Sequence, residues 1–205
     1  AVLEKEHKVA LYDYDIDILT NKRLKQVISS ENPDVVGLTA NTVSIKSARE
    51  IASAVKEHDK SVPVMIGGIH ATMDPDNCIN VPNFDFVIRS EAEYTILNLV
   101  NHLSDGNFDD IDGIWYRKNG EVIKKPEGAK IENLDELPFP ARHLIRKPGA
   151  YIPIDARRRP VTPMMTSRGC PARCNFCCTK NNLGLKFRYR SPDNVVAEME
   201  HSIEK

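Results

Sequence analysis

The chain has 205 residues and a net charge of -1, with 41% hydrophobic and 28% charged residues. These values are ordinary for a folded protein of one domain, or of one domain and part of another. The near-zero charge gives no support for binding to nucleic acid or to a membrane surface. No apolar run approaches the roughly 18 residues of a membrane span, and no leader pattern opens the sequence. We therefore expect a cytoplasmic protein with no membrane span.

The first half of the sequence alternates short apolar segments with amphipathic ones. Strands are expected at residues 9–12, 34–39, 62–66 and 84–88. Helices are expected at residues 23–30, 45–55 and 96–103, the first of them after a cap at Thr20 or Asn21. This alternation predicts an α/β fold whose mostly parallel sheet carries helices on both faces.

The pattern changes after residue 105. Residues 111–117 and 121–123 read as a hairpin around Asn119-Gly120, a strong two-residue turn signal. Prolines are frequent from 126 to 160, a short strand is expected at 161–166, and a helix follows the cap Ser191 and Pro192. We therefore divide the chain into an α/β domain at 1–125, a Pro-rich linker at 126–160 and the beginning of a second domain at 161–205.

Both ends of the sequence have a helical pattern. The chain begins at Ala1 within one such segment and stops at Lys205 within another. We expect it to be a piece of a longer protein, cut at both ends.

Three cysteines, Cys170, Cys174 and Cys177, share one short loop with the spacing C-x3-C-x2-C. Thiolate ligands suit iron–sulfur clusters and zinc. A structural zinc site needs four ligands, and no second cysteine pair follows; a C-x-x-C redox site would leave Cys170 unexplained. The spacing favours an iron–sulfur cluster with one open metal position, with zinc binding and redox chemistry as alternatives.

The run Ser167-Arg-Gly-Cys-Pro-Ala-Arg-Cys-Asn-Phe-Cys177 resembles the cluster motif of the radical S-adenosylmethionine enzymes. The resemblance implies that the three cysteines hold a [4Fe-4S] cluster whose fourth iron binds S-adenosylmethionine. One-electron cleavage of S-adenosylmethionine would then generate a 5′-deoxyadenosyl radical, with an electron donor such as flavodoxin or ferredoxin. Phe176 would lie beside the adenine, whereas Cys178 has no place in the motif.

The residues upstream resemble the cobalamin-binding domain that precedes the radical domain in one branch of that family. The matching stretches are residues 32–39, 64–72, 84–88 and 137–141. The resemblance implies a Rossmann-like parallel-sheet cobalamin-binding domain, lacking its first strand here, followed by the start of a radical S-adenosylmethionine (partial TIM) barrel. The Asp-x-His-x-x-Gly run that can supply a histidine to cobalt does not occur, and His70 is expected to make a loop hydrogen bond.

Candidate cobalamin contacts follow the strands, because parallel sheets bind ligands beyond the carboxyl ends of their strands. They are Thr39, Gly67, Gly68 and Glu91. Each also has an ordinary explanation: the two glycines can form a simple turn, and Ser90 with Glu93 matches a helix capping box. The family usually has glycine where this chain has Ser90.

The leading hypothesis is a radical S-adenosylmethionine enzyme that binds a [4Fe-4S] cluster, S-adenosylmethionine and cobalamin. Methyl transfer to an unactivated carbon is one implied outcome, on a small-molecule or peptide substrate that the sequence does not identify. This piece alone should be inactive, because later barrel strands would supply the remaining contacts. The alternatives are a radical enzyme with a non-cobalamin scaffold domain, and a flavodoxin-like binding domain with a structural zinc site.

Overall fold

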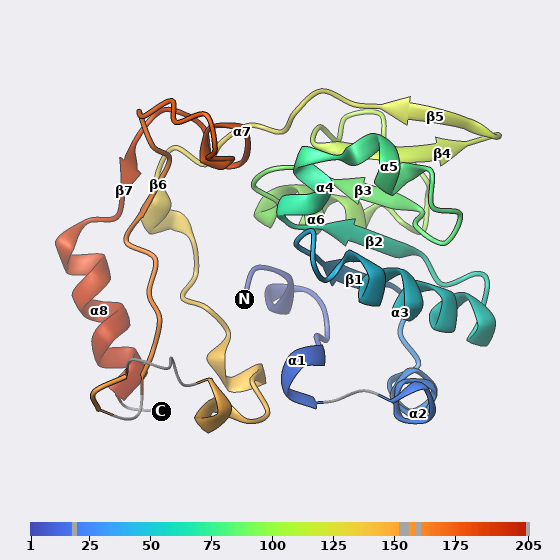
Figure 1. Cartoon of the computed structure of the whole chain (residues 1–205), viewed down its shortest axis with the longest axis horizontal. Coiled ribbons are helices and arrows are strands. Elements are labelled where there is room, and N and C mark those ends of the chain that lie inside the picture. The colour runs from blue at the N-terminus through green and yellow to red at the C-terminus, as the bar shows by residue number, and fades with distance from the viewer. Residues whose placement is uncertain (18–19, 152–155, 159–160, 204–205) are drawn as a thin grey trace.

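A five-stranded sheet forms the centre of the computed structural model, which describes residues 1–17, 20–151, 156–158 and 161–203 (Figure 1). The strands follow chain order: β1 (Val36–Thr39), β2 (Val64–Gly67), β3 (Phe86–Ile88), β4 (Ile114–Lys118) and β5 (Glu121–Lys124). The first three strands are parallel, and the last two form the antiparallel hairpin predicted from the sequence. The α/β fold with a parallel-stranded sheet is therefore confirmed.

Helices cover both faces of this sheet. They are α2 (Asn21–Glu31), α3 (Ile45–His58), α4 (Ile69–Met73), α5 (Pro75–Ile79) and α6 (Glu93–Asn101). Alternate side chains of a strand point to opposite faces, so Val64 and Ile66 of β2 pack with Ala52 of α3, whereas Met65 packs with Leu99 of α6. The two resulting hydrophobic cores hold the strand ends in place.

Local signals explain several element boundaries. The Thr20 hydroxyl accepts a hydrogen bond from the Arg23 amide at 3.3 Å, as expected of a helix cap. Asn119 and Gly120 both have positive φ, 53° and 85°, which a two-residue hairpin turn with right-handed twist requires. The Asn194 amide donates to the Ser191 hydroxyl at 3.2 Å, so the cap of α8 (Pro192–Ile203) is also confirmed.

Two predicted strands are wrong. Residues 9–12 form no strand and lie between a 3-10 turn, η1 (Leu3–Lys5), and α1 (Tyr14–Asp17). No strand forms among the described residues of 161–166 either; the two-residue β6 (Ser167–Arg168) follows and pairs antiparallel with β7 (Arg188–Tyr189). A strand is stabilised by its ladder to a neighbour, and in the described part of the chain neither segment forms such a ladder.

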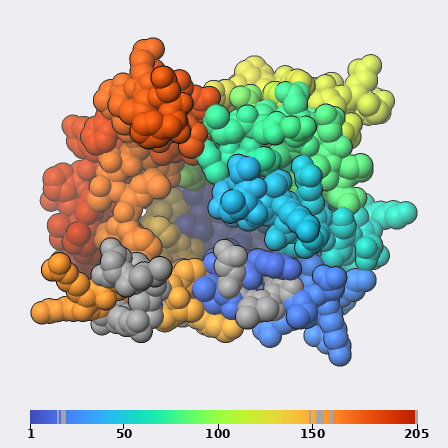
Figure 2. Space-filling model, in the orientation of Figure 1, coloured from blue at the N-terminus to red at the C-terminus, as the bar shows by residue number. Residues whose placement is uncertain are grey.

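The predicted linker lies between the sheet and the C-terminal segment (Figure 1). It contains three 3-10 turns, η2 (Leu134–Glu136), η3 (Arg142–Leu144) and η4 (Pro148–Ala150). Beyond it, the short helix α7 (Thr179–Asn182) contacts α4, and Figure 2 shows this contact at the top of the molecule with a hollow beneath it. No helix in the described residues has the length and hydropathy of a membrane span.

Candidate functional site

The cysteine loop joins β6 to β7 and is closed by backbone hydrogen bonds. The Cys170 amide donates to the Gly184 carbonyl at 3.1 Å, and the Cys177 amide donates to the Cys174 carbonyl at 3.2 Å. Gly169 has a φ of 85°, and a Cβ there would lie 2.0 Å from the Lys186 carbonyl oxygen. Only glycine fits immediately before Cys170, which accounts for the Arg-Gly-Cys order of the motif.

The thiols of this loop are free and accessible to different degrees. Cys170 and Cys177 are half-buried, whereas Cys174 and Cys178 are exposed. Hydrogen bonding between Cys177 and Thr179, whose Oγ1 lies 3.1 Å from the sulfur, lowers the pKa of Cys177 and favours its thiolate. Phe176, next to this residue, is 93% exposed.

The structure places the three predicted cluster ligands on one loop without gathering their sulfur atoms. Within the described ranges, no three His, Cys, Asp or Glu side chains come close enough together to share a metal ion. The assignment of Cys170, Cys174 and Cys177 as ligands therefore stays a prediction.

Three of the four predicted cobalamin contacts meet at the carboxyl edge of the sheet. Thr39 is the ladder partner of Gly67, and the neighbouring Gly68 has a φ of 90°. A Cβ on Gly68 would lie 2.6 Å from the Thr39 hydroxyl, whereas one on Gly67 would meet no atom closer than 3.8 Å. The edge therefore combines an exposed hydroxyl with a stretch of bare backbone.

His70 makes the loop hydrogen bond expected of it. Its Nδ1 lies 3.2 Å from the Thr42 hydroxyl, and its amide donates to the Ala40 carbonyl at 3.1 Å. The side chain therefore ties α4 to the loop after β1, beside the same edge of the sheet.

Glu91, the fourth predicted contact, is buried and already has partners. Its carboxylate accepts hydrogen bonds from the Arg188 guanidinium and from the Ile131 amide, the latter at 2.9 Å. Burial alone would raise the pKa of Glu91, but Arg188 and the amide outweigh burial and hold the pKa below its usual range. A contact between Glu91 and cobalamin stays a prediction. Because the carboxylate is engaged, the contact would be made by the Glu91 backbone.

The capping box proposed for Ser90 and Glu93 is wrong. The residue that caps α6 is Ala92, and no side chain caps this helix. Ser90 instead has a φ of 66° and donates its hydroxyl to the Asn182 carbonyl of α7, and Glu93 pairs with Arg168. Both side chains are used for contacts with the cysteine-loop segment, which a local pattern cannot reveal.

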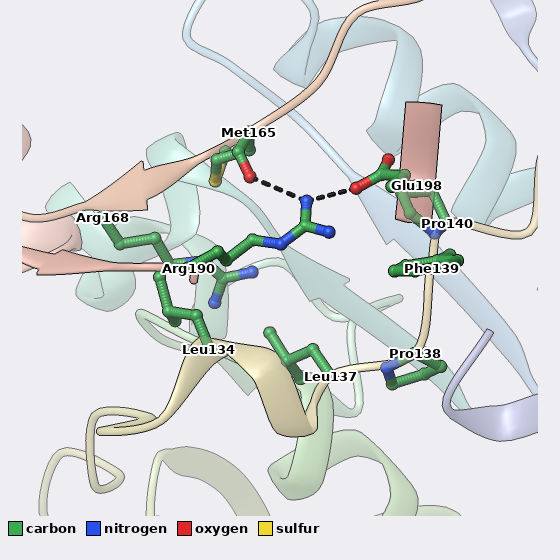
Figure 3. A pocket seen from close by; sticks show the side chains of 9 residues that line it. All are labelled: Leu134, Leu137, Pro138, Phe139, Pro140, Met165, Arg168, Arg190 and Glu198. Carbon is green, nitrogen blue, oxygen red and sulfur yellow. Dashed lines mark hydrogen bonds and ion pairs between the residues drawn. The ribbon is translucent and has the colours of Figure 1, made fainter. Parts of the chain in front are cut away.

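Sequence reasoning also missed a small pocket between the linker and α8 (Figure 3). It has a volume of about 90 Å³ and is lined by Leu134, Leu137, Pro138, Phe139, Pro140, Met165, Arg168, Arg190 and Glu198. Glu198 is 1% exposed and bonds the guanidinium groups of Arg190 and Arg142, and Arg190 also donates to the Met165 carbonyl at 3.2 Å. Residues 137–141 stand out in the sequence as a matching stretch and supply four lining residues, but nothing in the local sequence connects them to Arg190 and Glu198.

Comparison with known proteins gives the class of this chain. Residues 1–100 match the family model described as the B12 binding domain. The chain is 33% identical over 204 residues to an uncharacterized methyltransferase of Pyrococcus horikoshii, a match that covers 97% of this chain and 43% of the relative. It is 32% identical over 195 residues to the anaerobic magnesium-protoporphyrin IX monomethyl ester cyclase of Rubrivivax gelatinosus, covering 90% of this chain and 34% of the relative.

Solved structures agree in fold. The cobalamin-dependent S-adenosylmethionine radical enzyme OxsB superposes with a TM-score of 0.82 at 23% identity, over 98% of this chain and 27% of that chain. The radical S-adenosylmethionine methyltransferase TsrM from Kitasatospora setae superposes with a TM-score of 0.70 at 20% identity. This match covers 98% of the present chain and 41% of the TsrM chain.

These matches define a protein with a B12-binding domain that continues into the fold of radical S-adenosylmethionine enzymes. The chain is a B12-binding-domain-containing radical S-adenosylmethionine protein. It spans less than half the length of the curated relatives described above.

Proposed function

We propose that this chain supplies the cluster loop and the cobalamin-binding domain of a radical S-adenosylmethionine enzyme. Cys170, Cys174 and Cys177 would hold a [4Fe-4S] cluster, and Phe176 would lie beside the adenine of S-adenosylmethionine bound to the open iron. The observation that carries the proposal is that one chain places this cysteine loop next to the carboxyl edge of a B12-binding domain.

The residues of the loop fit a cluster. Thiolates are the normal ligands of iron–sulfur clusters, and the lowered pKa of Cys177 favours its ligating form. Cys170, Cys174 and Cys177 would hold this cluster, which when bound would supply one-electron chemistry to S-adenosylmethionine. Gly169 and the bonds that close the loop hold its backbone, and the exposed Cys174 leaves it accessible for cluster insertion.

The carboxyl edge of the sheet fits a large planar ligand. Gly67 and Gly68 let a ring system approach the backbone closely, and the exposed Thr39 hydroxyl can bond a polar group of the cobalamin nucleotide. Glu91 would contribute its backbone only, because its carboxylate is engaged.

For the reaction itself we propose methyl transfer to an unactivated carbon. The Pyrococcus relative is named a methyltransferase, which supports methyl transfer, and the Rubrivivax relative is named a cyclase, so ring formation is the competing outcome. We expect the enzyme to act in the cytoplasm on a small molecule or a peptide. Flavodoxin or ferredoxin would donate the electron that reduces the cluster.

The cluster is tested by anaerobic reconstitution of the chain with iron and sulfide, followed by metal analysis and electron paramagnetic resonance after reduction. Alanine at Cys170, Cys174 or Cys177 should remove most of the iron and the signal. Cys178→Ala is the matched control, because this exposed neighbour lies outside the ligand set, and it should keep both. Zinc without iron, or equal loss in Cys178→Ala, contradicts the cluster assignment.

Cobalamin binding is tested separately by equilibrium dialysis of the chain against hydroxocobalamin. Stoichiometric uptake is expected, and it should fall in Gly67→Ala, where the added methyl group reduces close approach to the backbone. A chain that takes up iron and sulfide but no cobalamin would instead be a radical enzyme with a scaffold domain.

A further inference from the structure

A buried ion pair joins the two places that the proposed function requires to be adjacent. Glu91 follows β3 at the carboxyl edge of the sheet, and Arg188 belongs to β7 beside the cysteine loop. Their side chains are 2% and 3% exposed. The guanidinium donates to both carboxylate oxygens, through Nη1 to Oε2 at 2.9 Å and through Nη2 to Oε1. This bidentate geometry fixes orientation as well as distance.

Further bonds complete the environment of this pair. Arg188 also donates to the carbonyls of Ile131 at 2.6 Å and Leu183 at 2.7 Å, and the Ile131 amide donates to Glu91. Arg168 of β6 brings a second guanidinium to 3.5 Å from Glu91 and also pairs with Glu93. The two arginines and two glutamates balance in charge, so the buried ions are compensated.

The residue before Glu91 points to the same role. Ser90 is held at a φ of 66°, a conformation that a residue with a Cβ adopts only at a cost. Its hydroxyl donates to the Asn182 carbonyl at 2.7 Å, and the Lys130 ammonium donates to that carbonyl at 2.8 Å. Backbone strain of this kind persists where surrounding contacts demand it, and here those contacts reach α7, directly after the cysteines.

We propose that Glu91 is a positioning residue, which holds the cysteine loop at a fixed place beyond the carboxyl edge of the sheet through Arg188 and Arg168. The role rests on the proposed function, because it sets where a cluster on the loop stands relative to cobalamin on the edge. Neutralising Glu91 removes the carboxylate that pairs with the buried Arg188 guanidinium and leaves Arg168 paired with Glu93, so the loop segment loosens while the sheet remains folded.

The test is hydrogen–deuterium exchange of the full chain, comparing Glu91→Gln with the matched control Glu93→Gln. Glutamine preserves size and removes the charge, and Glu93 is more exposed and, among the described residues, forms an ion pair only with Arg168. In Glu91→Gln, amides of residues 183–190 should exchange about tenfold faster or more, with those of α3 unchanged. Glu93→Gln should change the same amides less. Unchanged exchange at 183–190, or an equal rise in α3, overturns the proposal.

A second variant and a second signal separate positioning from simple stabilisation. Arg188→Lys keeps the charge but loses the bidentate fork, so it should accelerate exchange at 183–190 as well. In chain loaded with a reduced cluster and cob(II)alamin, Glu91→Gln should keep its iron but change the magnetic broadening between the two centres. Unchanged broadening overturns the proposal. If the chain binds neither a cluster nor cobalamin, the proposed function is refuted. The hydrogen–deuterium exchange experiment still tests the role of Glu91 in that case.

Discussion

Two adjacent glycines at the carboxyl edge of the sheet look equivalent in the sequence and differ in the structure. Gly68 has a φ of 90° and no space for a Cβ, whereas Gly67 has ordinary strand geometry and a Cβ there would meet its neighbours at 3.8 Å or more. The need for glycine at position 68 is therefore conformational. The need for glycine at position 67 would arise from a ligand.

We expect Gly68→Ala to lower the free energy of unfolding by about 1–3 kcal/mol, because the variant must adopt a left-handed conformation and displace the Thr39 hydroxyl. Gly67→Ala should change it by less than about 1 kcal/mol. Urea unfolding followed by circular dichroism measures both. Equal losses of unfolding free energy in the two variants would mean that glycine is not required by the backbone conformation at position 68.

Ser90 offers a second single-residue comparison. Alanine at this position loses the hydroxyl bond to Asn182 and keeps the strained φ of 66°, whereas glycine loses the same bond and relieves the strain. The free energy of unfolding of Ser90→Gly should therefore be about 1 kcal/mol larger than that of Ser90→Ala. The same urea titration decides the order, and a less stable glycine variant would show that Ser90 is not strained.

At the scale of elements, α6 is the helix whose loss would uncover the second hydrophobic core. Leu99 on this helix is fully buried against the face of the sheet that includes Phe86 and Met65. Leu99→Ala should cost about 2–5 kcal/mol of unfolding free energy through lost burial and a cavity. Asn98→Ala, on the exposed side of the same helix, should cost less than about 0.5 kcal/mol when both variants are unfolded in urea.

Elements with a strong local pattern could be predicted from the sequence, and elements that depend on a neighbour could not. The hairpin turn at Asn119-Gly120 and the cap at Ser191 are encoded in adjacent residues. Residues 9–12 have the composition of a strand, yet in the described ranges they lack the neighbouring strand that would make them one. The division of the chain at 125 and 160 stays a prediction.

In the candidate site, too, features encoded in adjacent residues could be predicted, and contacts between distant residues could not. Spacing alone identifies Cys170, Cys174 and Cys177 as a set. The partner of Glu91 lies 97 residues away in Arg188, and no local pattern connects the two. The local sequence predicts a capping box at Ser90 and Glu93, but Ser90 bonds the Asn182 carbonyl and Glu93 pairs with Arg168 instead.

At the scale of the whole molecule, acid should weaken the contacts between the sheet and the C-terminal segment. Although burial raises the pKa of Glu91 and of Glu198, their arginine partners more than offset it and hold each pKa below its usual value. A lowered pKa in the folded state means that the stability is present at neutral pH and is lost as pH falls through that folded value. The loss begins below about pH 4.5.

We therefore expect the difference in unfolding free energy between the wild type and Glu91→Gln, about 3 kcal/mol at neutral pH, to shrink as pH falls toward 3. Urea unfolding of both proteins at several pH values measures this difference. A difference that stays constant down to pH 3 would mean that the Glu91 charge does not contribute.

The buried pairs also have a consequence for a chain that has been cut. Arg157 and Arg158 are exposed, so trypsin can cleave between the segment with the sheet and the segment with the cysteine loop. The two pieces would still share the bonds from Arg188 to Glu91, from the Ser191 amide to Asp135, and from Glu198 to Arg142. The nicked protein should therefore elute as one particle in gel filtration, and the two pieces expressed separately should reassemble as a split protein.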